Sequence, residues 1–356
     1  MDRAFKPDIE RARQLWGQFW KGENKRPLVS IVTYKQGIEP VGHPRYLEGR
    51  DGNFQPLVDQ MLAWADTREF IGEAMPYFSV EWGPDTFSAF LGAELTFTPE
   101  DKPYTSWCRP FVKDWDDTEI RFKPESYWWQ LTVAFFRELK RRCGSGILIN
   151  PPTLVANLDS LAAIRGTENL LTDMMTCPDK VKTALERICD IHDEVLEAYA
   201  RELEFGVYGS IDVEGTYCEG THSRPQCDIS CAISPGMFRE FVMPCLIRET
   251  EVQDAAVYHL DGSGAIKHLE ALCEIDKIDL ISWVPSDGND RNSDWSGLHK
   301  KIDDLGKGQI INDLNFSQIE QICKKFKSRQ LIFRASAETK YEAEDFIARL
   351  ESLYDF

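Results

Sequence analysis

Short apolar runs alternate along almost the whole chain with stretches whose apolar side chains recur at helical spacing. Runs rich in β-branched and aromatic residues are typical of strands buried on both faces, and an apolar repeat every three or four residues is typical of helices that cover such strands. We predict eight strands, at Leu28–Tyr34, Tyr77–Glu81, Gly146–Asn150, Val207–Val213, Ala256–Leu260, Asp279–Trp283, Gln309–Asn312 and Gln330–Arg334.

Predicted helices follow most of these strands. The longest begins with Pro178, which suits the first helical position, and with Asp179, which suits the positive end of the helix dipole. Gly206 then ends it. The predicted helices span Ile9–Trp20, Asp85–Leu91, Trp128–Cys143, Pro178–Phe205, Pro235–Gln253, Ala265–Cys273, Trp295–Asp304, Phe316–Phe326 and Tyr341–Leu353.

Eight strand–helix units predict an α/β fold, a single (β/α)8 TIM barrel. We expect residues 1–25 to form an N-terminal helical extension and residues 26–356 to form the barrel, interrupted by an inserted aromatic-rich loop at Lys102–Trp129. Because the Tyr77–Glu81 strand is weak, a doubly wound open sheet is the alternative. A nucleotide-binding version of that sheet is disfavoured, since the sequence has neither G-x-G-x-x-G nor a Walker-type G-x-x-x-x-G-K-[ST].

Composition narrows the class of protein. The 356 residues include 41 Lys and Arg against 59 Asp and Glu, a formal charge of −18, and 42% are hydrophobic. Such a chain can bury a large core, and without a basic run it suits neither nucleic acid nor an anionic membrane. No apolar run is long enough to span a bilayer, and the N-terminus lacks a signal-peptide core. We therefore expect a cytoplasmic protein with ten reduced cysteines.

The chemistry of such barrels collects at the carboxyl ends of the strands. The residues at which the apolar runs stop are Tyr34 and Lys35, Glu81 and Trp82, Asn150, Asp212 and Glu214, His259 and Asp261, Trp283, Asn312 and Asp313, and Arg334. Strand ends are also polar where they simply reach the surface, so each residue alone is weak evidence. Together they predict a polar, acidic and aromatic ring at the barrel mouth.

Two pairs within this ring stand out. His259 and Asp261 are spaced by two, so both face the same side of one strand, and Gly262 allows a tight turn after them. His259 could serve as a metal ligand, a general acid or base, or an anchor for a substrate carboxylate, and it could also be a hydrogen-bonded structural residue. Asp212 and Glu214 have the same spacing and could supply paired carboxylates for acid–base chemistry.

A third group contains Cys218, His222, Cys227 and Cys231. Its pattern, C-x₃-H-x₄-C-x₃-C, matches none of the usual zinc-finger spacings. We therefore expect the cysteines to be buried thiols and the segment to be a mobile loop, with zinc binding as the alternative.

Several segments resemble the uroporphyrinogen decarboxylase superfamily, which includes the cobalamin-dependent (corrinoid) methyltransferases. The segments are QCDISCAISPGMFREFVMPCL (Gln226–Leu246), YHLDGSGAIKHLEALCEIDKIDLISWVP (Tyr258–Pro285), LAAIRGTENLLTDMMTCPDKV (Leu161–Val181) and, more weakly, PDTFSAFLGAEL (Pro84–Leu95). The resemblance runs from Arg26 to the C-terminus, is most specific between Asp228 and Pro285, and implies a (β/α)8 barrel.

The sequence departs from both branches of that superfamily. The decarboxylases carry an R-x-A-G-R motif for acidic substrate arms, but the corresponding stretch here, RPLVSIVTYKQGIEP, lacks both arginines. The thiol-activating methyltransferases bind zinc through H-x-C and a later Cys. Here Asp261 stands where the first Cys is expected, and Arg334-Ala335-Ser336 where the last is expected. Losing both sulfurs makes zinc of the usual type doubtful and leaves His259 and Asp261, with a third oxygen or nitrogen ligand, as the candidate metal ligands.

The resemblance implies an enzyme of the methyltransferase-like branch, moving a methyl group between a corrinoid carrier protein and a small acceptor or donor such as a pterin. Of the strand-end residues above, we assign substrate positioning and protonation to Glu81, Asp212, His259 and Asp261. Substrate binding is assigned to Tyr34, Lys35, Trp82, Asn150, Glu214, Trp283, Asn312 and Arg334, with Trp107 as a further wall.

Two other functions stay open. A cofactor-free decarboxylase would need a cation near the carboxylate of its substrate, for which Lys35, Arg109 and Arg334 are candidates. A non-catalytic subunit that binds a corrinoid or a protein partner is the third reading. We expect no covalently bound cofactor, and we leave a homodimer open.

Overall fold

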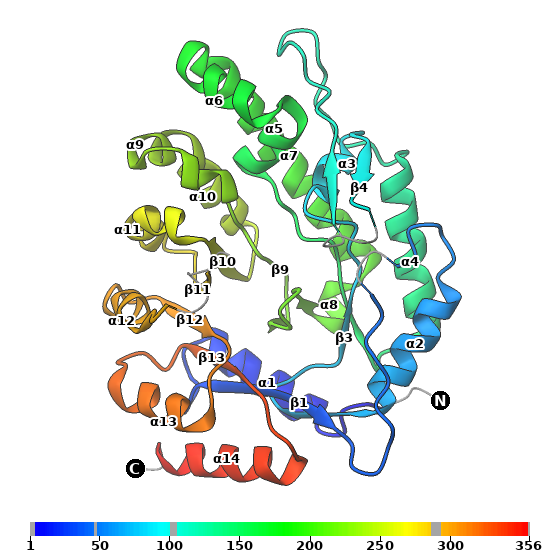
Figure 1. The fold of residues 1–356 in the computed structure, drawn as a ribbon, viewed down its shortest axis with the longest axis vertical. Helices are drawn as coiled ribbons and strands as arrows, with labels where there is room; N and C mark the ends of the chain where they lie inside the picture. Colours follow the sequence, from blue (N-terminus) through cyan, green and yellow to red (C-terminus); the bar gives the residue numbers. More distant parts are fainter. Residues whose placement is uncertain (1–3, 46–47, 100–104, 286–292, 355–356) are drawn as a thin grey trace.

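The computed structural model describes residues 4–45, 48–99, 105–285 and 293–354. Its central element is a mostly parallel sheet of 7 strands in the order β2-β1-β13-β12-β11-β10-β9, in which only β2 runs antiparallel to its neighbour (Figure 1). The strands are β1 (Leu28–Tyr34), β2 (Arg68–Gly72), β9 (His222–Ser223), β10 (Ala255–Asp261), β11 (Leu280–Val284), β12 (Gly308–Ile311) and β13 (Leu331–Ala335).

Three strand pairs stand outside this sheet. β3 (Tyr77–Ser79) pairs in parallel with β6 (Leu148–Asn150), and β7 (Ser210–Ile211) pairs antiparallel with β8 (Tyr217–Cys218). β6 contacts β7, and β7 contacts β9. The ladders of the described residues do not close into a barrel, so the predicted closed barrel is not found, although the arrangement is compatible with a barrel-like fold. A further antiparallel pair joins β4 (Leu95–Phe97) to β5 (Ser106–Cys108).

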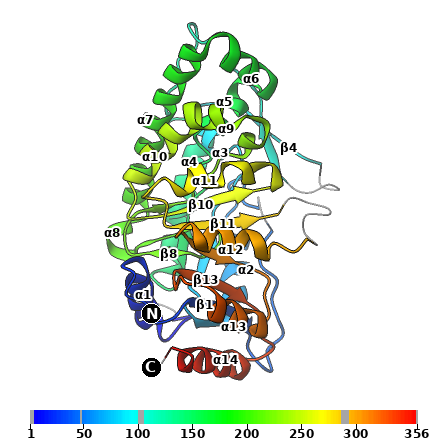
Figure 2. The same cartoon turned by 90° about the vertical axis from the view of Figure 1, so that its left-hand side faces the viewer.

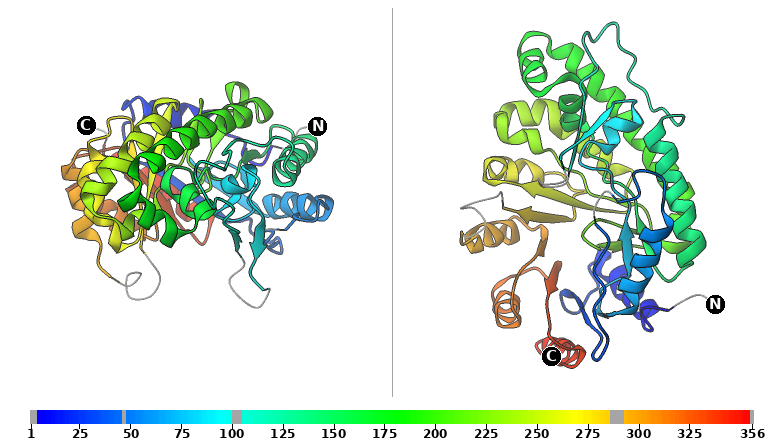
Figure 3. Two further views of the ribbon diagram at one scale, coloured as in Figure 1. Left: turned by 90° about the horizontal axis from the view of Figure 1, so that it is seen from above. Right: turned by 45° about the vertical axis from the view of Figure 1, so that its right-hand side comes forward.

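Helices cover the outside of these strands (Figure 3). The α-helices are α1 (Ile9–Trp20), α2 (Gln55–Asp66), α3 (Thr86–Phe90), α4 (Tyr127–Cys143), α5 (Asn157–Arg165), α6 (Thr167–Thr176), α7 (Pro178–Glu202), α8 (Phe205–Tyr208), α9 (Pro235–Met237), α10 (Met243–Glu251), α11 (Leu269–Cys273), α12 (Ser296–Asp304), α13 (Phe316–Lys325) and α14 (Lys340–Ser352). Short 3₁₀ segments span Asp228–Ala232 and Ser263–His268, and a π-helical turn spans Phe238–Val242. No helix in the described part of the chain is long and apolar enough to span a membrane.

Local sequence explains why these helices begin and end where they do. In α7, Pro178 occupies the first turn, and the buried side chains recur at helical spacing. In α13, Asn315 and Gln318 form a capping box, in which each side chain accepts a hydrogen bond from the other's backbone N–H.

The strands enclose an apolar floor. One side chain from each of several strands meets there, namely Leu28, Leu148, Ile211, Val257, Leu280, Ile310 and Ile332. Helix α1 closes this floor, because Trp16 and Phe19 belong to the same cluster, and Trp16 donates its indole N–H to the Glu73 carbonyl at 2.9 Å. Figure 2 shows α1 at the end where β10 and β11 begin, so the carboxyl ends of those strands point away from it.

The alternate residues of the same strands face outward. Tyr258 and Leu260 of β10, and Ile281 and Trp283 of β11, join the larger core cluster under the helices. The side-chain period of two therefore places His259 and Asp261 on the inner face and Trp283 on the outer one. The expectation that Trp283 lies in the same ring as His259 is wrong for this reason.

The predicted strand Val207–Val213 is also wrong over its first half. Glu204 adopts a left-handed backbone conformation with φ of 55°, which ends α7 and starts the short helix α8. Only Ser210–Ile211 is extended, and Asp212 and Glu214 lie in the turn between β7 and β8. The inserted loop begins among residues outside the described part, and from Ser106 onward it contains β5 and an irregular segment that leads into α4.

Candidate active site at the strand ends

A polar layer lies directly above the apolar floor. On β1 and β13, Ser30 stands opposite Arg334, and on β10 and β11, His259 stands opposite Ser282. These residues are two positions further along their strands than the apolar floor residues, so their side chains follow the same inner face toward the carboxyl ends. The sequence thus changes from apolar to polar in one step along each of these strands.

Asp212 anchors one side of this layer. Its carboxylate accepts hydrogen bonds from Nε and Nη2 of Arg224 at 3.0 and 2.6 Å, from the His222 ring at 3.2 Å, and from two backbone N–H groups of its own turn. Burial alone would raise the pKa of Asp212, but Arg224 and His222 hold that pKa well below its usual range. Asp212 is therefore an ionised structural anchor for Arg224.

Glu214 links two arginines. Its Oε2 lies 2.9 Å from Nη2 of Arg224, 3.2 Å from Nη1 of Arg334 and 3.1 Å from the hydroxyl of Ser282. Burial opposes the ionisation of Glu214, but the two guanidinium groups outweigh it and lower the pKa of this carboxyl. The predicted pair of Asp212 and Glu214 is thus brought together by a third residue, Arg224, that carries both.

A second cluster stands at the end of β10. His259, Asp261 and Asp228 each offer one ligand atom, and these atoms lie within 4.8 Å of one another. The backbone of His259 pairs with the Pro225–Gln226 segment, which carries Asp228 two residues later to the same place. Nδ1 of His259 is buried and has no hydrogen-bond partner among the described residues. The group is the only set of metal-ligating side chains found in the described part of the chain.

The electrostatics of this cluster favour an added cation. Burial and the nearby Arg224 guanidinium lower the pKa of His259, so its ring is neutral near pH 7 and can donate a lone pair. Desolvation and the neighbouring carboxylates of Asp159 and Asp261 raise the pKa of Asp228, because like charges oppose its ionisation. A bound cation would remove that repulsion.

The other predicted residues are distributed more widely. Asn150 is buried beside the Ser79 hydroxyl at 3.0 Å. Tyr34 is 53% exposed, and its ring lies 4.1 Å from the Arg68 guanidinium. Lys35 is half-buried next to it in sequence. Tyr34 and Lys35 thus lie at the end of β1, whereas Asn150 stands two residues beyond the floor residue Leu148 and lines a small cavity with Asp212 and Arg224. No described contact joins any of the three to His259.

Glu81 and Trp82 make separate contacts, and only Trp82 belongs to the outer core cluster. The Glu81 carboxylate accepts hydrogen bonds from the backbone of Trp82 and Thr153 and from the Thr86 hydroxyl. Burial raises its pKa to about 7. Trp82 is fully buried and donates its indole N–H to Thr132 of α4. Glu81 thus contacts α3 and Trp82 contacts α4, and no described contact joins either of them to His259.

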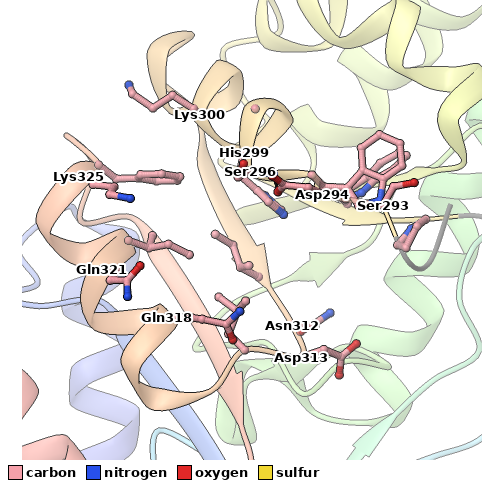
Figure 4. Close-up of a pocket in the computed structure, with 18 of the residues that line it drawn as sticks. Ser293, Asp294, Ser296, His299, Lys300, Asn312, Asp313, Gln318, Gln321 and Lys325 are labelled. Atoms are coloured by element: carbon pink, nitrogen blue, oxygen red, sulfur yellow. Dashed lines mark hydrogen bonds between the residues drawn. The ribbon is translucent and has the colours of Figure 1, made fainter.

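A cavity of about 950 Å³ lies beside the strand ends, between α12 and α13. Figure 4 shows its polar lining, which comes from His299 on α12, Gln318 and Gln321 on α13, and Asn312 after β12. The outward-facing Trp283 lines this cavity and not the space beside His259.

The segment that carries Cys218, His222, Cys227 and Cys231 does not form a metal-ligand cluster among the described residues. Both ring nitrogens of His222 are engaged, one with the Ala255 carbonyl at 2.9 Å and the other with Asp212. Cys218 and Cys227 are buried, whereas Cys231 is exposed. His222 is thus part of the Asp212 network.

Sequence reasoning missed Arg224 and Asp228. A signal was present, because His222, Arg224, Gln226 and Asp228 alternate with other residues along an extended segment. Polar residues at a spacing of two indicate one polar face of a strand. Pro225 and Cys227 stand between these polar residues, so the segment does not look like a strand.

Comparison with known proteins adds one result. No family model and no curated protein matches the sequence. Among solved structures, a methyltransferase from Methanosarcina mazei superposes with a TM-score of 0.60 over 96% of this chain and 98% of its own, with 11% of residues identical. At that identity the similarity is one of fold.

Proposed function

We propose that this chain is an enzyme of the methyltransferase-like branch of the uroporphyrinogen decarboxylase superfamily, with the (β/α)8 barrel architecture of that superfamily. It transfers a methyl group between a corrinoid carrier and a small acceptor or donor such as a pterin. The observation that carries this proposal is the cluster of His259, Asp261 and Asp228, at the carboxyl end of β10, in a chain with the fold of a methyltransferase.

The residues present fit a divalent cation. One imidazole and two carboxylates form an all nitrogen-and-oxygen set, and such ligands suit Mn²⁺, Fe²⁺ or Zn²⁺ better than a thiolate-selective site would. The unpartnered Nδ1 of His259 supports this fit. A cation bound there would act as a Lewis acid toward an oxygen or nitrogen of the small substrate. His259 and Asp261 would hold the cation, and Asp228 would complete the ligand set from the neighbouring segment.

The experiment measures metal content and methyl transfer on one preparation. We expect the purified protein to hold about one divalent cation per chain and to demethylate methylcobalamin, followed by its visible spectrum, when a suitable acceptor is present. Asp261→Asn should lower the metal content, and it should reduce the rate of methyl transfer by roughly 10²-fold or more. Asp276→Asn, which changes an exposed carboxyl elsewhere, should alter neither. Equal rates in the two variants would refute the proposal.

One observation favours the decarboxylase alternative. Among its candidate cations, Arg334 lies in the polar layer, whereas Arg109 is 67% exposed in its side chain and pairs with Glu94. A guanidinium inside the site suits a carboxylated substrate. Release of CO₂ from such a substrate, without any change in methylcobalamin, would select this alternative.

A further inference from the structure

Two guanidinium groups converge on one oxygen in the polar layer. Arg224 follows β9 and Arg334 lies on β13, yet both contact Oε2 of Glu214, at 2.9 and 3.2 Å. The two guanidinium groups therefore share a single carboxylate oxygen. The fold thus brings together two arginines that are 110 residues apart in the sequence.

Each of these arginines has one nitrogen left over. Arg224 is 3% exposed, and its Nη1 is buried without an acceptor among the described residues. Nη2 of Arg334 is likewise buried without an acceptor among the described residues. A buried charged donor without an acceptor is strongly destabilising. The site is therefore built to give these two N–H groups an acceptor that the described part of the chain does not supply.

The existing carboxylates do not fill this need. Asp212 faces Nε and Nη2 of Arg224 and shares its charge with His222 and two backbone N–H groups. Glu214 shares its charge among Arg224, Arg334 and Ser282. The free edges of the two guanidinium groups thus keep a local positive potential, although the four charged groups sum to zero.

We propose that Arg224 and Arg334 bind an oxyanion group of the small-molecule substrate, a carboxylate or a phosphate, through these two free N–H groups. The planar guanidinium fork suits paired oxygens of this kind. Because Ser282, which donates to Glu214, stands opposite His259 in the β10–β11 register, the anion lies beside the His259 cluster. The inference rests on the proposed function only in that a small substrate enters at the strand ends.

The test measures anion binding without any methyl donor. Acetate and inorganic phosphate are titrated separately into the full chain at constant ionic strength, with chloride as the balancing anion, and Kd is obtained by calorimetry together with the rise in Tm. We expect saturable binding of at least one probe in the wild-type protein. Arg334→Gln should weaken it by at least about tenfold, the loss of one charge-assisted hydrogen bond. Arg109→Gln, an exposed arginine, should bind as the wild type does.

A second variant keeps the inference testable if Arg334→Gln fails to fold. Glu214→Gln removes the competing negative charge, so the same probe should bind several-fold more tightly. Which probe saturates identifies the oxyanion as planar or tetrahedral. Binding no stronger than that of chloride, equal affinity in Arg334→Gln, or weaker binding in Glu214→Gln would overturn the inference. Anion binding without methyl transfer would refute the proposed function alone, and methyl transfer without anion binding would refute this inference alone.

Discussion

At the scale of single residues, His259 lies between the Arg224 guanidinium and the carboxylates of Asp228 and Asp261. Its backbone N–H donates to the Pro225 carbonyl, which holds the backbone of His259 against the segment that carries Asp228. Burial and the Arg224 charge lower its pKa, so the ring is neutral at pH 7. A neutral imidazole beside Asp228 and Asp261 can bind a cation or accept a proton, and both roles require the free ring nitrogen.

We therefore expect His259→Asn to fold normally and to lose roughly 10²-fold or more of kcat/KM, the scale of a positioned acid–base or ligand group. The matched control is His268→Asn. His268 is 1% exposed, bonds the Ser230 carbonyl at 2.9 Å and stacks on Phe238, so it is a structural histidine.

The two variants should show opposite behaviour when kcat/KM and Tm are measured together. His268→Asn should lose stability by about 1–3 kcal/mol and keep the activity of its folded fraction. A fully active, stable His259→Asn protein would remove this residue from the site.

These residues also show how far the sequence alone can lead. The spacing of two correctly placed His259 and Asp261 on one face, because strand geometry is local. It could not show that Asp228 joins them or that Arg224 links Asp212 to Glu214. The place of Asp228 depends on the pairing of Gln226 with His259, which brings together segments more than 30 residues apart, and that of Arg224 on the turn that carries Asp212 and Glu214. Such pairing is a property of the folded chain.

At the scale of elements, α1 matters because it closes the apolar floor. Trp16 is fully buried there, and Trp20 of the same helix donates its indole N–H to the Tyr217 carbonyl at 2.8 Å. The helix thus ties β8 to the base of the sheet. The polar layer lies directly on this floor. A substitution that disrupts the packing of α1 should therefore also disturb the candidate active site.

For this reason we expect Trp16→Ala to lower the free energy of unfolding by about 3–5 kcal/mol, the cost of removing a large buried aromatic side chain. Trp107→Ala is the control, because Trp107 is 56% exposed on β5. Its effect should stay within roughly 0.5 kcal/mol. Denaturant unfolding of both variants, followed by circular dichroism, measures the difference. Equal stabilities would mean that α1 is dispensable for the floor.

Helices and strands differ in how far their positions can be predicted from the local sequence pattern. Helices with strong periodicity, such as α1 and α7, begin where the pattern predicts. Strand β2 was missed because Arg68–Gly72 is short and pairs antiparallel with β1 directly after α2. The outward direction of Trp283 depends on which residues of β11 face the floor, and a run of apolar residues on both faces does not reveal that.

At the scale of the whole molecule, buried carboxyl groups set the response to pH. Burial is the largest cause that raises the pKa of Glu249 to about 8, of Glu81 to about 7 and of Asp159 to about 6. In the unfolded chain such groups ionise near pH 4. Asp212 and Glu214 behave in the opposite way, since their pKa values are lowered by the arginines.

The two sets destabilise the fold at opposite ends of the pH scale. As pH rises from about 4 to 8, the unfolded chain releases protons that Glu249, Glu81 and Asp159 still hold in the fold, so their contribution to stability is progressively lost. As pH falls below about 4, the contribution of Asp212 and Glu214 is lost instead. We therefore expect the free energy of unfolding to decrease steadily between pH 5 and 8.

Glu249→Gln isolates one part of this decrease. Glu249 is 1% exposed and accepts a hydrogen bond from Asn157 that a glutamine can keep. At roughly 1.4 kcal/mol per pKa unit, the variant should lose less stability than the wild type between pH 5 and 8, by about 1–3 kcal/mol. Glu251→Gln, which changes an exposed carboxyl of the same helix, should follow the wild-type curve. Because the net charge of −18 repels itself more strongly as pH rises in all three proteins, that general effect cancels in the comparison. Parallel curves for Glu249→Gln and the wild type, measured by urea denaturation at several pH values, would show that Glu249 is ionised in the folded protein.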